Sequence, residues 1–72
     1  MHTILIVDDD ATNLTILNKL LKPTYQVRAA RSGPLALRAA SSEPRPDLIL
    51  LDIMMPGMSG YEVLQNLRAQ AA

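Results

Sequence analysis

The sequence has no cysteine, no excess of charge of either sign and no long apolar run. Without cysteine, neither a disulfide nor a thiolate metal site can stabilise it. Seven Lys and Arg residues balance seven Asp and Glu residues, so the chain lacks the basic surface typical of nucleic-acid or anionic-membrane binding. Its longest apolar runs have four residues, far short of the roughly 20 that span a bilayer. We therefore expect no membrane association, no direct nucleic-acid binding and a cytoplasmic location.

The chain is also short, at 72 residues, of which 49% are apolar and 19% are charged. These fractions are typical of globular chains, so packed structure is expected. Domains usually contain about 100–150 residues. We therefore expect a single unit over residues 1–72, with a small core and no covalent cross-link.

Two wholly apolar runs, residues 4–7 and Leu48–Leu51, predict strands buried on both faces. Burial on both faces is typical of the central strands of a parallel sheet. Between them, Tyr25, Val27 and Ala29 alternate with polar neighbours, which is the period-two pattern of a strand with one wetter face. This second strand is expected at a sheet edge.

Helical spacing and capping signals predict three helices. Leucines at helical spacing mark the first, Ser32 is the N-cap of the second, and Ser59 with Glu62 forms an S-x-x-E capping box for the third. We place them at about residues 11–22, at 32–41 and from 59 onward. Strands that alternate with helices in this way predict an α/β fold with an open parallel sheet and right-handed crossovers.

Acidic residues follow both apolar runs: Asp8, Asp9 and Asp10 after the first and Asp52 after the second. The carboxyl ends of neighbouring parallel strands meet at one edge of an open sheet, where ligands bind. If the two strands are neighbours, their carboxylates converge at this edge and repel one another. Raised pKa values of the carboxyl groups or a hard divalent cation would relieve this repulsion, and oxygen ligands suit Mg²⁺. We therefore predict a Mg²⁺ site, while Asp10 is more simply the N-cap of the first helix.

The residues that carry a family resemblance are ILIVDD at 4–9 and DLILLDIMMPGMSG at 47–60. They resemble the receiver domain of bacterial two-component response regulators. The intervening pattern Tyr25-x-Val27-x-x-Ala30-x-x-Gly33-x-x-Ala36-Leu37 also matches this family. The resemblance implies a CheY-like, flavodoxin-like fold in which the first three parallel strands have the order 2-1-3.

The resemblance also implies residue roles. Asp52 would be the phosphoacceptor, attacking the phosphorus of a phosphohistidine on a histidine kinase or phosphotransfer protein. Asp9 and Asp52 would bind Mg²⁺ directly, Asp8 through a water molecule, and Met54 through its backbone carbonyl. The neighbouring Pro56 and Gly57 would shape the loop that aims this carbonyl. In this interpretation the chain is a phosphoacceptor and not an enzyme.

Two other functions fit parts of the same sequence. Asp8-Asp9-Asp10-Ala11-Thr12 also resembles the first motif of haloacid-dehalogenase-like phosphohydrolases, with Asp8 as nucleophile and Asp10 as general acid. Those enzymes need a later Lys and further acidic residues, and they lack the loop between Asp52 and Gly60. The third possibility is an interaction module that works without phosphorylation.

The resemblance implies that a complete receiver domain has a five-stranded sheet in the order 2-1-3-4-5. Residues 1–72 would then form a partial receiver domain that lacks the fourth and fifth βα units. The Ser or Thr and the Lys of those units would be missing, and we expect impaired phosphorylation and switching. Leu48–Leu51 would then be an edge strand. We expect it to pair antiparallel with a second copy, giving a homodimer with a six-stranded sheet, or else a domain-swapped dimer.

The remaining charged residues suggest no site. His2 is expected at the surface near the N-terminus. The arginines are scattered and are expected to be solvated: Arg28, Arg31, Arg38, Arg45 and Arg68.

Overall fold

The structure is a three-stranded parallel sheet in which a helix follows each strand. The computed structural model describes residues 2–52, 54–55 and 57–71. The elements are β1 (Thr3–Val7), α1 (Ala11–Leu21), β2 (Gln26–Ala30), α2 (Gly33–Ser41), β3 (Leu48–Leu51) and α3 (Gly60–Ala71). The strand order is β2-β1-β3 with parallel pairing throughout. The predicted fold class and strand order are therefore confirmed.

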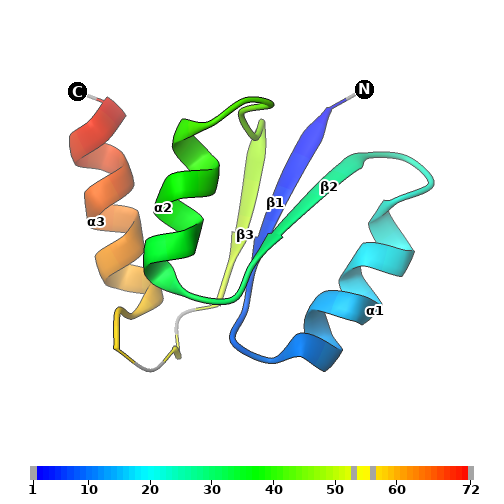
Figure 1. Cartoon of the computed structure of the whole chain (residues 1–72), viewed down its shortest axis with the longest axis horizontal. Helices are drawn as coiled ribbons and strands as arrows, with labels where there is room; N and C mark the ends of the chain where they lie inside the picture. The colour runs from blue at the N-terminus through cyan, green and yellow to red at the C-terminus, as the bar shows by residue number, and fades with distance from the viewer. Residues whose placement is uncertain (1, 53, 56, 72) are drawn as a thin grey trace.

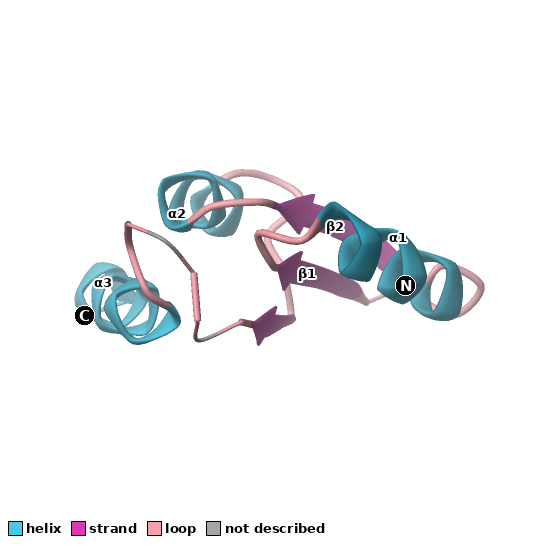
Figure 2. Ribbon diagram, turned by 90° about the horizontal axis from the view of Figure 1, so that it is seen from below, coloured by secondary structure: helices cyan, strands magenta, loops and turns pink. Residues whose placement is uncertain are grey.

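The helices lie on both faces of the sheet. Figure 1 shows the strands with α1 at one side and with α2 and α3 next to each other at the other side. Figure 2 shows that α1 covers one face, while α2 and α3 lie on the opposite face. Among the described residues, no helix is long and apolar enough to cross a membrane.

Strand β1 is buried on both faces, as predicted from its continuous apolar run. Leu5 and Val7 belong to one cluster with Val63 of α3, whereas Ile6 packs with Leu14 of α1. Alternate side chains of a strand point to opposite faces. β1 therefore joins both halves of the core.

The N-caps of all three helices are the predicted ones, since each cap side chain accepts a hydrogen bond from a backbone N–H of the first turn. The bonds are Thr12 N–H to Asp10 at 2.8 Å, Leu35 N–H to Ser32 at 3.3 Å and Glu62 N–H to Ser59 at 3.3 Å. The first helix ends at Leu21, and Lys22 is its C-cap. These caps fix where the chain leaves each strand.

Strand β3 is exposed where its apolar run predicts burial on both faces. The exposed fraction is 53% for Leu48 and 38% for Leu50, so that prediction is wrong for this strand. Both side chains lie on the face that α1 covers over β1 and β2, and among the described residues no helix covers that part. The prediction that β3 is an edge strand is confirmed.

Strand β2 is also an edge strand, as predicted, but its alternation is incomplete. Ala29 is exposed, although it lies on the same sheet face as the half-buried Val27. Arg28 is half-buried, and its guanidinium donates to the backbone carbonyls of Ala39 at 2.7 Å, Ser42 at 3.0 Å and Pro44 at 2.9 Å.

The prediction that Arg28 is a solvated surface residue is therefore wrong. Carbonyls at the end of a helix and just beyond it have no partner within the helix, and the two N–H donors of Arg28 Nη1 are shared among three of them. The other four arginines are exposed, as predicted.

Candidate functional site

Strand pairing places Asp8 and Asp52 next to each other. Val7 is the partner of Leu51 in the parallel pair of β1 and β3, so each strand continues directly into one of these acids. Asp52 N–H donates to Val7 O at 2.9 Å, and Asp8 N–H donates to Ala30 O at 3.1 Å. These backbone bonds fix both residues at the carboxyl end of the sheet.

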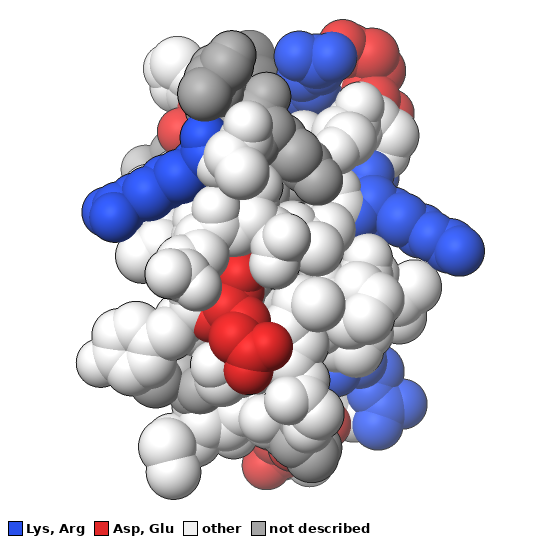
Figure 3. Space-filling model, turned by 90° about the vertical axis from the view of Figure 1, so that its left-hand side faces the viewer, with Lys and Arg blue, Asp and Glu red and all other residues white. Residues whose placement is uncertain are grey.

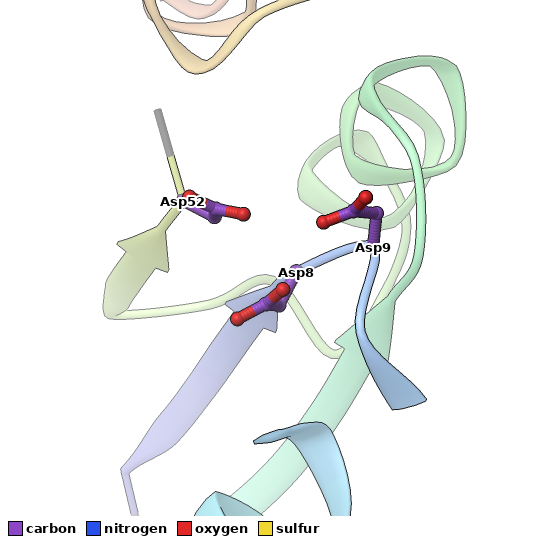
Figure 4. Close-up of side chains that lie close together, drawn as sticks. All are labelled: Asp8, Asp9 and Asp52. Atoms are coloured by element: carbon purple, nitrogen blue, oxygen red, sulfur yellow. The ribbon is translucent and has the colours of Figure 1, made fainter. Parts of the chain in front are cut away.

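Asp8, Asp9 and Asp52 form one cluster, as predicted. Each contributes a carboxylate oxygen, and these three oxygens lie within 4.8 Å of one another. Figure 4 shows the three side chains around one common space at the ends of the strands. Asp8 and Asp52 are half-buried, and Asp9 is exposed.

The Asp8 carboxylate is held by two hydrogen bonds within the chain. Its Oδ1 accepts from Asp10 N–H at 2.9 Å, and its Oδ2 accepts from Asn13 Nδ2 at 3.2 Å. The first bond belongs to the turn that leads into α1, and the second comes from the first turn of that helix. Both oxygens of Asp8 are therefore engaged by protein donors.

The carboxylates of Asp52 and Asp9 differ in their hydrogen bonds. Asp52 Oδ1 accepts Met54 N–H at 3.1 Å, which orients this carboxylate at the end of β3. Within the described ranges, no hydrogen bond or ion pair joins the Asp9 carboxylate to another residue. Asp9 is thus the carboxylate that is most open to an external ligand.

The donor set fits a hard divalent cation. Mg²⁺ binds oxygen ligands at about 2.0–2.1 Å, so two direct ligands lie at most about 4.2 Å apart, close to the 4.8 Å limit of this cluster. No described Lys or Arg forms an ion pair with these carboxylates, whose charges are therefore not neutralised by a side chain in direct contact. Small shifts or bridging waters would complete such a site.

The loop that follows Asp52 is only partly described. The Met54 side chain is 84% exposed. Gly57 has φ of +77°, a conformation that favours glycine, which agrees with its predicted role in shaping the loop. Pro56 lies outside the described residues, and the predicted role of the Met54 carbonyl as a ligand stays a prediction.

Asp10 lies outside the cluster and caps α1, as predicted. The arrangement therefore gives no support to a site in which Asp8 and Asp10 act as a catalytic pair. Sequence reasoning missed Asn13, whose amide orients Asp8. Its position in the first turn after the acidic run is the only sequence signal for this contact.

Gly33 has a close contact that the sequence did not predict. A Cβ on Gly33 would lie 2.7 Å from Met58 Cβ, closer than real Cβ contacts allow. The start of α2 therefore packs directly against the loop that links β3 to α3. Only glycine permits this approach.

The sequence model described as "Response regulator receiver domain" matches residues 4–72. The chain is 48% identical over 66 residues to a probable cyclic di-GMP phosphodiesterase of Vibrio cholerae, covering 92% of this chain and 15% of that protein. It is 47% identical over 66 residues to the response regulator PleD of Caulobacter vibrioides, covering 90% and 14%. The chain thus spans only a small part of these relatives.

Solved structures give the same result. The chemotaxis protein CheY4 of Vibrio cholerae matches with a TM-score of 0.90 and 33% identity, over 99% of this chain and 59% of that one. TrrA of Thermotoga maritima, solved in complex with Mg²⁺ and BeF, matches with a TM-score of 0.86 and 37% identity, over 97% and 61%.

TrrA has also been solved in complex with the histidine kinase ThkA, and there the TM-score is 0.82 at 37% identity, over 97% of this chain and 60% of that one. Sequence motif, strand order and structural likeness thus agree over nearly the whole chain. The chain belongs to the response regulator receiver domain family.

Proposed function

We propose that the chain is a phosphoacceptor in a two-component phosphorelay and that Asp52 accepts the phosphoryl group. The observation that carries this proposal is the cluster of Asp8, Asp9 and Asp52 at the carboxyl ends of two adjacent parallel strands. The donor would be a phosphohistidine on a histidine kinase or a phosphotransfer protein. The complex of TrrA with ThkA supports a partner of this kind.

The chain's own residues supply position and charge for the transfer. An Asp52 carboxylate oxygen forms the new bond to phosphorus while the bond from phosphorus to the donor imidazole nitrogen breaks, and that nitrogen keeps the electron pair. The bond from Met54 N–H to Asp52 Oδ1 orients the carboxylate for this attack. Phosphoryl transfer depends mainly on such positioning and on charge neutralisation.

The three carboxylates would hold Mg²⁺. Asp9 and Asp52 would be direct ligands, together with the Met54 backbone carbonyl. Both oxygens of Asp8 already accept hydrogen bonds from the protein, which supports a contact through water for Asp8. A bound Mg²⁺ offsets the negative charge that accumulates when a phosphoryl group meets a carboxylate cluster.

We also propose that phosphorylation of these 72 residues is slow compared with longer receivers such as TrrA. Among the described residues, no Lys or Arg forms an ion pair with the cluster, so these residues contribute no direct cation to the phosphoryl charge. The second partner that we propose is another copy of the chain, bound at the edge strand β3 (Leu48–Leu51).

The test is incorporation of labelled phosphoryl groups from acetyl phosphate in the presence of Mg²⁺. We expect slow labelling of the parent chain and none with Asp52→Asn. Asp10→Asn is the matched control, because Asn is an equally good N-cap and a phosphohydrolase would need Asp10 as its acid. Labelling that persists in Asp52→Asn, or no labelling of the parent at saturating donor, would contradict the proposal.

A further inference from the structure

The edge strand β2 directs the backbone groups of two residues away from the sheet. In a parallel pair, alternate residues direct their N–H and C=O toward the neighbouring strand. Gln26 N–H and Ala30 O form hydrogen bonds on the β1 side. In this register the N–H and C=O groups of Val27 and Ala29 face outward, while their side chains lie on the sheet face that α1 covers.

A groove lies beside this edge, between α1 and β2. It consists of two adjoining open pockets, which share Asn18 and Val27 in their linings. Lys19 lines the pocket that reaches Ala29 near the end of β2, and Lys22 lines the pocket at the start of the strand. Figure 2 shows β2 at one margin of the sheet with α1 next to it. We call this feature the α1–β2 groove.

The α1–β2 groove is cationic. Lys19 and Lys22 are the only lysines of the sequence, and both are exposed. In the part of the chain that the structure describes, neither lysine forms an ion pair, and no acidic residue lines either pocket. Figure 3 shows a different surface on the α3 side, which is mainly uncharged with one small acidic patch near its centre. An acidic ligand is therefore attracted to the groove and not to the α3 side.

We propose that the α1–β2 groove binds an extended acidic segment of a partner protein, which adds to the sheet as a further strand beside β2. The backbone of this segment pairs with the outward N–H and C=O groups of Val27 and Ala29, and its carboxylates contact Lys19 and Lys22. Segments that add to a sheet edge take their affinity from such backbone bonds and their specificity from alternate side chains.

The spacing of the two lysines fits a strand. Lys19 and Lys22 are three residues apart, which corresponds to about 4.5 Å along the helix axis. Side chains on one face of a strand are about 6.6 Å apart, a difference that the flexible lysine stems can accommodate. The pattern expected in the partner is therefore acidic-x-acidic, with both acids on the face toward α1.

The α1–β2 groove is separate from the phosphoacceptor cluster and from the β3 edge. None of its lining residues belongs to the cluster of Asp8, Asp9 and Asp52. In the strand order expected for a complete receiver, 2-1-3-4-5, further strands add at β3, so β2 stays at the other edge of the sheet. Binding of a segment here therefore does not compete with transfer to Asp52.

NMR titration with a synthetic peptide in which threonine alternates with glutamate tests the proposal. We expect the largest amide shifts in β2 and in the part of α1 that lines the groove, and binding that weakens as salt is added. Lys19→Gln and Lys22→Gln together should lower the affinity about two- to thirtyfold. Arg68→Gln is the matched control and should leave the affinity unchanged, because Arg68 is an exposed cation on α3.

Two further probes test the strand pairing. Ala29→Pro removes an N–H that faces away from β1, so it breaks no hydrogen bond within the sheet. It should weaken binding about tenfold, whereas Ala29→Ser, which keeps the N–H, should bind as the parent does. The second probe needs no variant of the chain: a form of the peptide that is methylated on its backbone nitrogens cannot donate to β2 and should not bind.

The outcomes separate strand addition from its alternatives. No binding of the glutamate peptide in the millimolar range, or shifts confined to another part of the chain, would overturn the proposal. Full affinity of the methylated peptide would show that charge alone attracts the ligand and would overturn strand addition. Equally tight binding of poly-uridylate would assign the two lysines to nucleic acid and would overturn the choice of partner.

Discussion

Thr3 and Asp47 are joined by two hydrogen bonds that fix the start of β3 on β1. Thr3 N–H donates to Asp47 Oδ2 at 2.8 Å, and Asp47 N–H donates to Thr3 O at 2.7 Å. The pair lies at the opposite end of the strands from the carboxylate cluster. Because pairing register is continuous along a strand, it helps to align Asp52 with Asp8.

This pair makes stability depend on pH. The Thr3 N–H bond holds the pKa of Asp47 below its ordinary value of 3.8, desolvation of the carboxylate acts in the opposite direction, and the nearby His2 adds to the lowering. The ionised form is therefore favoured by folding. Its contribution is present above pH 3.8 and is lost as the pH falls through the lower folded-state pKa.

We predict that Asp47→Asn flattens this acid limb. The measurement is urea unfolding at fixed protein concentration between about pH 5 and pH 3. The parent chain should lose more stability than the variant over this interval. Parallel curves for the two proteins would show that Asp47 does not carry the effect.

Removal of the Asn13 amide should weaken Mg²⁺ binding. Asn13→Ala leaves Asp8 Oδ2 without its donor, so the carboxylate is less well oriented for a water-mediated contact. A net hydrogen bond contributes about 0.5–1.5 kcal/mol, which corresponds to about a two- to tenfold loss of affinity. NMR titration with Mg²⁺ measures this, and Asn18→Ala on the same helix should leave the affinity unchanged. Equal effects of both substitutions would argue against the role of Asn13.

A methyl group at Gly33 should displace the loop after β3. Gly33→Ala places its Cβ 2.7 Å from Met58 Cβ, and overpacking of this kind costs about 1–3 kcal/mol. Denaturant unfolding should show this loss, and it should be smaller in a Met58→Gly background. A double-mutant cycle with no coupling between the two positions would show that this contact does not cause the loss of stability.

Loss of the Arg28 guanidinium should destabilise the end of α2. Arg28→Ala leaves the carbonyls of Ala39, Ser42 and Pro44 without this donor, and we expect a cost of about 1–3 kcal/mol. Arg31→Ala is the control, because Arg31 is exposed and should change stability by less than about 0.5 kcal/mol. Urea midpoints distinguish the two variants, and similar midpoints would contradict a structural role for Arg28.

The elements and their order along the chain could be predicted from the sequence, because each element depends on a local signal. Apolar runs mark strands, and Asp10, Ser32 and Ser59 mark the helix starts as N-caps. The convergence of Asp8 with Asp52 follows from strand adjacency, which the family resemblance supplied.

Contacts between segments that are distant in the sequence could not be predicted from such local signals. Arg28 has the sequence environment of a surface strand residue, yet its bonds depend on where α2 ends. Leu48 and Leu50 look like central-strand residues, and only the number of neighbouring strands decides their exposure. Gly33 fits the family pattern, but its reason lies in the approach of Met58.

The most direct test of Asp52 as the phosphoacceptor is the position of the acyl phosphate after reaction with acetyl phosphate and Mg²⁺. Reduction with borohydride converts a phosphorylated aspartate to homoserine, which mass spectrometry of peptides can locate. We expect homoserine at Asp52, formed only in the presence of Mg²⁺. Homoserine at Asp8, or at Asp52 in equal amount without Mg²⁺, would contradict it.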